Sequence, residues 1–474
     1  MPKNQLHQYR DITPEFRAPT DCVPPLKKSH AAFSIAPFAF DVTPPLNHAL
    51  LGGLVMPVIG HDDPLEAIGY VLLSGDAPIV VCALDWAGLL NDAHFAWRRA
   101  LAKAAGTTPD RVAVQCVHQH NAPFACPGAR ATALNRGLPA MFETDFFDAC
   151  LERAQSAVRA ALHAPRPVSH VGHGRADVRR VASNRRIARD GAGRVLTMRG
   201  SMCADPGLRA LPEGLIDPAM QTVAFFSGAE KIVSCHYYAT HPMSYYRDGR
   251  VSSDFCGLAR KRRQLEEPAC AHLYFTGCAG DVAAGKYNDG SRAAREGLAR
   301  RVHAGIVESE STLDPQPLTG VEWRTESILP RPQPPPGENE APSYGTDAEL
   351  TARLLRDFRF SWIRRLERQV PLELSCLRLN EISILNLPGE MFVEYQLRAQ
   401  AMRPGRPVAV AAYGDDGPWY IPTKAEYPAG GYEVSVAFCG ADLDDLITAA
   451  MRRLLTGNDD FPGAQSSAAA AASR

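Results

Sequence analysis

The alternation of short apolar runs with amphipathic helical patterns constrains the fold of this chain more than any other feature. Between residues 33 and 309, apolar runs such as Ile79–Leu84 alternate with stretches of helical periodicity such as residues 91–106. This order is typical of an α/β architecture with mixed sheets flanked by helices. No internal repeat is visible in the sequence. We predict further strands over residues 111–117, 223–226, 232–239, 272–276, 381–387 and 408–412, and further helices over residues 143–163, 291–308, 346–368, 391–402 and 443–455.

The same pattern predicts the domain organisation. Residues 1–32 are polar and contain several prolines, and we expect an N-terminal arm there. Residues 33–457 are expected to form a single large domain. A proline-rich stretch and the helix after it form an excursion over residues 330–369, because candidate functional residues lie on both sides of it. The Ser/Ala-rich residues 458–474 are expected to be a disordered tail.

Composition excludes several functional classes. The chain has 51 Lys+Arg and 52 Asp+Glu, so it lacks the basic excess of a nucleic-acid-binding protein. No stretch is apolar enough for a membrane span, and no signal peptide is visible at the N-terminus. The twelve cysteines include no Cys-x-x-Cys pair, which favours reduced thiols and a cytoplasmic location. A small-molecule substrate is the expected partner, and a homo-oligomer stays open.

Candidate metal ligands follow several of the predicted strands. His118 and His120 come directly after the strand over residues 111–117, and His241 follows the strand over residues 232–239. Glu390 follows residues 381–387 and begins the next helix, where the macrodipole favours an ionised carboxylate. Ligands of α/β sheets bind at such strand ends, and two histidines with one glutamate form a known catalytic zinc set. Each residue alone is also consistent with a structural role in capping a strand or a helix, which is the more common role of a single histidine or of a glutamate at a helix start.

Two further loops carry candidate residues. The glycine-rich turn after residues 272–276 lacks the Gly-Lys-Ser/Thr ending of a phosphate loop, so we interpret Asp281 within it as a carboxylate in a cleft. A turn-stabilising aspartate is the alternative. The loop after residues 408–412 ends in Trp419 and Tyr420, and local chemistry does not distinguish between these two aromatic residues.

In their order along the chain, these stretches resemble the neutral/alkaline ceramidases, zinc-dependent amidases that cleave N-acyl sphingosine. The resemblance runs from about residue 33 to residue 455 through six short motifs. They are Asp41-Val42-Thr43-Pro44-Pro45, His118-Gln119-His120-Asn121-Ala122-Pro123, Thr240-His241 with Ser252-Ser253-Asp254, Gly280-Asp281-Val282, Pro388-Gly389-Glu390, and Tyr420-Ile421-Pro422-Thr423 with Glu426-Tyr427.

The resemblance implies roles for individual residues. One zinc ion would be held by His118, His241, Glu390 and Tyr420. His120 would stabilise the developing oxyanion or move a proton, and Asp281 would be the general base on the metal-bound water.

The sequence also departs from the ceramidase pattern. Ala283 stands where the family has a serine after its Gly-Asp-Val, and neither the family's C-terminal β-sandwich nor a secretion signal is recognised. These departures favour a small polar substrate over ceramide. Candidate polar contacts to such a substrate are Lys286, Asn288, Arg185 and Arg250, although each is also consistent with a turn or a solvated surface.

Three functions remain open from the sequence. The leading hypothesis is a zinc-dependent hydrolase that acts on an amide or ester carbonyl of a small polar substrate. The second is a metal-dependent hydrolase or lyase that cleaves glycosides, since the family serine is missing. The third is a non-catalytic metal-binding protein, because a fold does not fix a function.

Overall fold

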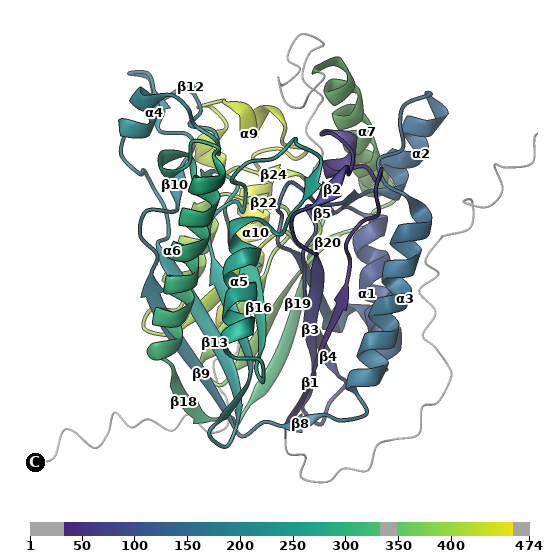
Figure 1. The fold of residues 1–474 in the computed structure, drawn as a ribbon, viewed down its shortest axis with the longest axis vertical. Coiled ribbons are helices and arrows are strands. Elements are labelled where there is room, and N and C mark those ends of the chain that lie inside the picture. Colours follow the sequence, from purple (N-terminus) through teal and green to yellow (C-terminus); the bar gives the residue numbers. More distant parts are fainter. Residues whose placement is uncertain (1–32, 332–347, 458–474) are drawn as a thin grey trace, which may run out of the picture. The chain divides into compact units, whose positions relative to one another are not determined.

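The computed structural model describes residues 33–331 and 348–457. The expected arm, the tail and most of the proline-rich stretch lie outside these residues. Within them the α/β architecture is confirmed, with several sheets flanked by helices in a single large domain (Figure 1). None of the helices in these two ranges combines the length and the apolar character of a membrane span.

The long strands form three sheets that share one topology. In each sheet, two antiparallel pairings come first, and a strand–helix–strand crossover then adds one parallel strand at the edge. The second and third sheets repeat these pairings. A further helix follows each parallel strand. We call each such set of elements a unit.

The units consist of the following elements. The first contains β1 (Ser34–Asp41), β3 (Glu66–Leu73), β4 (Ile79–Leu84), α1 (Asp92–Ala105), β6 (Val112–Cys116) and α3 (Thr144–Ala161). The second contains β9 (His170–Asp177), β13 (Ala219–Ser227), β14 (Glu230–Tyr238), α5 (Asp254–Glu266), β16 (Ala271–Thr276) and α6 (Arg292–Ser311). The third contains β19 (Val321–Ile328), β20 (Leu372–Leu379), β21 (Ile382–Asn386), α8 (Val393–Ala401), β23 (Val408–Ala411) and α10 (Leu443–Thr456).

The repetition extends to the edges of the first two sheets. After α3 the chain returns as β8 (Arg166–Pro167) beside β1, and after α6 it returns as β18 (Asp314–Pro317) beside β9. In the third unit, α7 (Ala348–Glu367) is inserted between β19 and β20, which nevertheless pair along all eight residues. The same topology thus occurs three times within the described residues, although no repeat is visible in the sequence.

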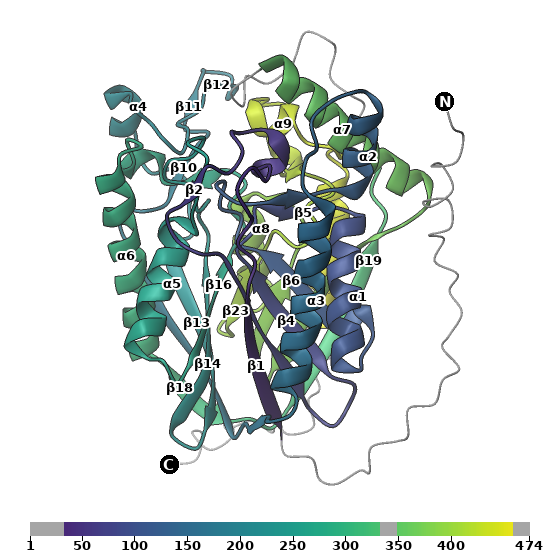
Figure 2. The same ribbon diagram turned by 45° about the vertical axis from the view of Figure 1, so that its right-hand side comes forward.

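The inner faces of the three sheets pack into one shared core. Tyr70 of the first sheet, Phe225 of the second and Ile384 of the third belong to the same buried cluster. The helices cover the outer faces, with α1 and α3 on the first sheet and α5 and α6 on the second (Figures 1 and 2). Burying apolar surface on both sides of each sheet is the main stabilising contribution.

Local sequence explains the elements that were predicted correctly. All six residues of β4 are buried, as expected for a continuous apolar run. Helix α1 ends at Gly106, which has a φ of 68° and donates its N–H to Ala102. Helix α6 begins after Ser291, whose side chain accepts the N–H of Ala294.

Short elements inserted after the long strands gather at one end of the sheets (Figure 1). Six of them form three parallel pairs, β2 (Gly60–His61) with β15 (Arg250–Val251), β5 (Gly88–Leu89) with β7 (Phe124–Ala125), and β22 (Glu390–Met391) with β24 (Tyr420–Ile421). Further insertions are α2 (Pro127–Asn135), β10 (Ser183–Asn184), β11 (Ala188–Arg189), β12 (Val195–Thr197), α4 (Pro206–Ala210), β17 (Val282–Ala283) and α9 (Tyr432–Ser435).

Candidate metal centre

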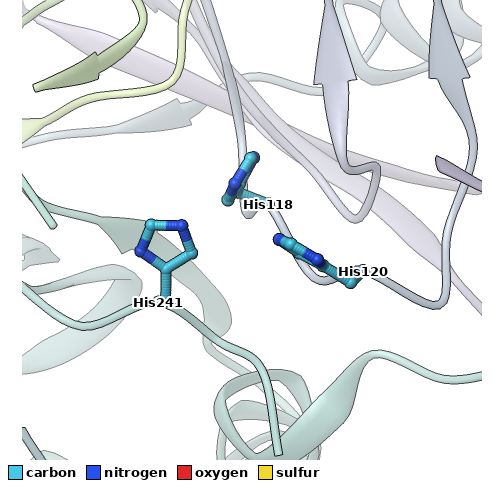
Figure 3. Close-up of side chains that lie close together, drawn as sticks. All are labelled: His118, His120 and His241. Atoms are coloured by element: carbon cyan, nitrogen blue, oxygen red, sulfur yellow. The ribbon is translucent and has the colours of Figure 1, made fainter. Parts of the chain in front are cut away.

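Three histidines meet where two of the units adjoin. His118 and His120 follow β6 of the first unit, and His241 follows β14 of the second. Figure 3 shows the three imidazoles turned toward one another. One nitrogen of each lies within 4.8 Å of the others, and all three side chains are buried.

Backbone carbonyls fix the orientation of two of these rings. The Nδ1 atom of His118 lies 2.6 Å from the carbonyl oxygen of Ala87, and Nδ1 of His241 lies 2.6 Å from that of Ala279. A carbonyl oxygen only accepts hydrogen bonds, so Nδ1 carries the proton in both rings. In a neutral imidazole the Nε2 atom then has a lone pair and no proton.

Glu390 of the third unit faces both of these lone pairs. Its Oε2 atom lies 3.0 Å from Nε2 of His241 and 3.3 Å from Nε2 of His118. Burial alone would raise the pKa of the Glu390 carboxyl, but the adjacent His118 and His241 hold it well below its ordinary value. Burial and the nearby Arg185 guanidinium lower the pKa of His241 to about 4. When both rings are neutral and protonated on Nδ1, three hydrogen-bond acceptors converge among buried side chains, and a cation between them would satisfy all three.

Two tyrosines of the third unit complete the wall. Glu390 and Tyr420 are register partners in the β22–β24 pair, and the Tyr420 ring lies parallel to His241 at 6.4 Å. The Tyr420 hydroxyl accepts a hydrogen bond of 3.1 Å from Arg185. Tyr413 stacks on His118 with ring centroids 4.3 Å apart. Tyr413 was not predicted as a site residue, although one residue separates it from the end of β23, just as one residue separates His118 from the end of β6.

Strained backbone surrounds this pocket. Three residues other than glycine have positive φ angles here: His118 (75°) and Tyr413 (59°) stack on each other at the centre, and Arg247 (78°) lines the adjacent cavity. Such angles cost on the order of 1 kcal/mol or more each for these residue types. Strain of this kind is maintained by the surrounding structure and is concentrated at functional sites.

His120 differs from the other two histidines in its neighbours. Its ring lies edge-on to His118 at 5.1 Å and to Tyr246 at 5.2 Å. Burial and the adjacent His118 and His241 lower its pKa well below the ordinary value, so it is neutral. His120 also lines a cavity of about 440 Å³ together with Arg185 and Tyr420. It therefore lies between the three converging acceptors and the space that a substrate would fill.

Asp281 is buried and anchors a helix. One carboxylate oxygen accepts the N–H of Val393 at 2.8 Å, at the start of α8, and the other accepts the side chain of Asn184 at 2.7 Å. Burial and the nearby Glu394 raise the pKa of Asp281 to about 7. In the part of the chain that the structure describes, the residues that line this cavity do not include Asp281. The predicted role as general base stays a prediction.

Comparison with known proteins bears on the fold. No family model and no curated protein sequence matches the chain. A solved structure of a ceramidase complexed with C2 is similar, with a TM-score of 0.66 and 15% identity over 90% of this chain and 75% of that one. The neutral ceramidase from Pseudomonas aeruginosa matches with a TM-score of 0.66 and 16% identity, over 90% and 74%. The chain has a ceramidase-like fold. At this level of identity the likeness concerns the fold alone.

The predicted substrate contacts divide into two groups within this ceramidase-like fold. Arg185 lines the cavity, where its guanidinium lies 5.4 Å from the Tyr420 ring. The other three side chains make contacts outside the cavity lining. Lys286 donates to the carbonyls of Arg209 and Leu211, Asn288 donates to those of Ser201 and Ser244, and Arg250 pairs with Asp62. These three contacts join the inserted loops to one another.

A second cluster of metal-binding residue types lies within the second unit. His236 and His272 stack with ring centroids 5.4 Å apart, and Glu310 of α6 lies beside them. Here, however, the carboxylate already has cationic partners, because Lys231 and Arg263 each approach Glu310 to 2.5 Å. The converging acceptors near His118 differ in this respect, so we assign the candidate metal centre there.

Proposed function

We propose that this chain is a metal-dependent hydrolase whose catalytic domain spans residues 33–457. His118, His241, Glu390 and Tyr420 would hold one zinc ion, and the substrate would be a small polar molecule with an amide or ester carbonyl. The observation that carries the proposal is the convergence of two imidazole lone pairs on a buried carboxylate. Two nitrogens and one carboxylate oxygen are a donor set that suits zinc in catalytic sites.

When bound, zinc would supply Lewis-acid activation of a carbonyl and of a water molecule. The chain's own residues would do the rest. His120 is neutral and lines the cavity, so it is placed to accept a proton and to pass it to a leaving group. Burial raises the pKa of the Tyr420 hydroxyl well above its ordinary value, and the Arg185 guanidinium, 3.1 Å from this hydroxyl, opposes part of that rise. Asp281 remains the proposed general base, and His120 is the alternative candidate for that role.

The bond type is taken from the structural neighbours, which are ceramidases. The proposed substrate is different and more polar. Ala283, which stands in place of the family serine, is buried in β17 and pairs with β10, where Ser183 donates to its carbonyl at 2.8 Å. A methyl group in that position offers no hydroxyl to a substrate. The lining of the cavity also mixes guanidinium, hydroxyl and thioether groups.

Metal analysis combined with substrate turnover tests this proposal. We expect purified protein to bind one equivalent of zinc by elemental analysis and to hydrolyse some member of a panel of N-acyl and ester compounds. His118→Asn should abolish both properties. The partly buried His303, which pairs with Glu266 on the outer helices, provides the matched control His303→Asn, and this variant should leave both properties unchanged. A folded wild-type protein that binds no metal after dialysis against zinc would overturn the proposal.

A further inference from the structure

Ser201 places a buried hydroxyl in the wall of the cavity that His120 also lines. The residue is 4% exposed, and its Oγ atom forms no hydrogen bond with any residue in the ranges that the structure describes. Buried hydroxyl groups are nearly always paired, because an unpaired one costs free energy. Since no hydrogen bond to these residues fixes its rotamer, rotation about the Cα–Cβ bond can turn the hydroxyl toward the cavity. A ligand in the cavity is the partner that such a group would take.

Hydrogen bonds hold the backbone on either side of Ser201. The N–H of Arg199 donates to the carbonyl of Arg185 at 2.8 Å, and the N–H of Cys203 donates to the carbonyl of Asn288 at 3.0 Å. The side chain of Asn288 in turn donates to the carbonyl of Ser201 at 2.6 Å. The Ser201 side chain therefore projects from a fixed backbone, and such preorganisation lowers the entropy lost when a ligand binds.

The side chain of Arg199 anchors the same loop. It is fully buried, and its guanidinium donates at 3.0–3.3 Å to the backbone carbonyls of Asn184, Leu208, Leu211 and Glu213. On the opposite side, a Cβ atom at Gly285 would lie 2.1 Å from the carbonyl oxygen of Gly200, so only glycine permits this close approach. The loop that carries Ser201 is thus packed and hydrogen-bonded on both sides, while the Ser201 hydroxyl itself takes no part in these contacts.

Ser183 shows how a serine with a structural role is used in the adjoining strand pair of β10 and β17. It is 1% exposed, and its hydroxyl donates to the carbonyl of Ala283 at 2.8 Å and accepts the N–H of Lys286 at 3.1 Å. Both hydrogen-bonding functions of the Ser183 hydroxyl are therefore used inside the protein. Those of Ser201 remain available to a ligand, as far as the described residues are concerned.

We infer that Ser201 is a specificity-determining residue and that the preferred substrates carry a neutral group that both donates and accepts hydrogen bonds, such as a carboxamide. The inference rests on the proposed hydrolase function and narrows its substrate class. A serine hydroxyl is uncharged and acts as donor and acceptor. The nearby Arg185 adds no net charge, because the Glu433 carboxylate lies 3.2 Å from its guanidinium. Such a site rejects an alkyl group of the same size, which would leave the serine unpaired.

Matched pairs of substrates test this inference. The 4-nitroanilides of succinamic acid and 4-methylpentanoic acid exchange a carboxamide for an isopropyl group on the acyl side, and N-acetylglycinamide and N-isobutylacetamide do so on the amine side. We expect at least one carboxamide to exceed its alkyl partner more than tenfold in kcat/KM. Ser201→Ala should bring the members of that pair within threefold of each other, and Ser201→Thr, which keeps the hydroxyl, should retain part of the preference. Ser311→Ala, at the exposed end of α6, is the control and should leave the ratio unchanged.

A binding measurement separates this inference from the hydrolase proposal. The same four compounds are titrated into the metal-free protein in the presence of a chelator and followed by ligand-observed NMR, so the result does not depend on turnover. The wild type should bind at least one carboxamide more than fivefold more tightly than its alkyl partner, and Ser201→Ala should bind both members equally. This result would support the inference even if no substrate is hydrolysed. A wild type without a preference in either pair would overturn it.

Thermal unfolding distinguishes a ligand-binding serine from a structural one. Ser201→Ala removes a hydroxyl that is unpaired among the described residues, so the Tm of the ligand-free protein should stay the same or rise. Ser183→Ala is the same substitution at another buried serine, removes two hydrogen bonds and should lower the Tm by about 2 °C or more. Equal losses of Tm in the two variants would overturn the inference, as would a carboxamide preference that Ser201→Ala leaves unchanged.

Discussion

The Nε2 atom of His241 and the Oε2 atom of Glu390 lie 3.0 Å apart as two hydrogen-bond acceptors facing each other. The Nδ1 atom of His241 lies 2.6 Å from the carbonyl oxygen of Ala279 and therefore carries the ring proton. With a neutral ring and an ionised Glu390 carboxyl, the contact is repulsive and the carboxylate is poorly solvated unless a cation lies between them.

Glu390→Gln should have opposite effects on metal binding and on the stability of the metal-free protein. The glutamine amide donates an N–H where the carboxylate only accepts, so the metal-free protein should gain about 1 kcal/mol in its free energy of unfolding. Zinc affinity should fall at least tenfold, because an anionic ligand is lost. Urea unfolding with a chelator and a zinc titration measure the two effects. A metal-free variant less stable than the wild type would contradict the predicted acceptor–acceptor contact.

Asp281 should make the metal-free protein less stable as the pH rises. Its pKa is raised to about 7, whereas an unfolded aspartate titrates near 4. Between these values the unfolded chain loses a proton that the folded chain keeps, so the contribution to stability falls from pH 4 to pH 7. Asp281→Asn should remove this pH dependence. Between pH 4.5 and pH 7.5, the free energy of unfolding of the variant relative to the wild type should therefore rise by roughly 2 kcal/mol. Chemical unfolding at both pH values measures the difference, and parallel pH profiles would refute it.

The stacked pair of His236 and His272 should make the protein more stable as the pH rises. Burial lowers the pKa of His272 to about 4 and that of His236 well below its ordinary value. A histidine with a depressed pKa contributes stability above pH 6.5, and this contribution is lost as the pH falls toward 4, because only the unfolded chain gains the proton. His272→Gln should flatten the fall in unfolding free energy between pH 7 and pH 5 by about 1 kcal/mol. An unchanged slope would contradict the prediction, because it would show that His272 has the same pKa in the folded and the unfolded chain.

The buried ion pair between Arg186 and Glu433 should be important for stability. Their side chains are 1% and 0% exposed, and a nitrogen of Arg186 lies 2.7 Å from the carboxylate. Glu433→Gln removes the counter-charge that Arg185 and Arg186 share and leaves Arg186 with Glu426 alone, and it should cost about 3 kcal/mol. The surface pair of Arg453 with Glu326 is the control, and Glu326→Gln should cost less than about 1 kcal/mol. Similar losses in the two variants would contradict this prediction.

The elements predicted from the sequence are those whose signals are local. The apolar run of β4 and the capping residues of α1 and α6 depend only on neighbouring residues. Strand β9 was missed because its sequence, His-Val-Gly-His-Gly-Arg-Ala-Asp, contains glycine and charge where strands favour branched side chains. Strand β19 was missed because only its last residue is buried.

Part of the candidate site could also be predicted from the sequence. The convergence of His118, His241 and Glu390 was foreseen because each follows a strand of a sheet, and strand ends meet at one edge. Arg247 has no such signal, since it lies in a loop that contains no apolar pattern. Lys286 was predicted as a polar contact to the substrate, and its hydrogen bonds to carbonyls of a loop more than seventy residues away in sequence could not be predicted with it. Partners this distant are set by tertiary structure alone.

The threefold repeat of the topology also determines when the candidate centre can exist. The first unit supplies His118, the second supplies His241, and the third supplies Glu390 and Tyr420. No single unit holds more than two of these four residues, so a fragment that lacks any unit lacks part of the coordination sphere. Metal affinity would therefore report that all three parts of the chain have assembled, and an incomplete or partly unfolded chain would be inactive and unable to sequester zinc.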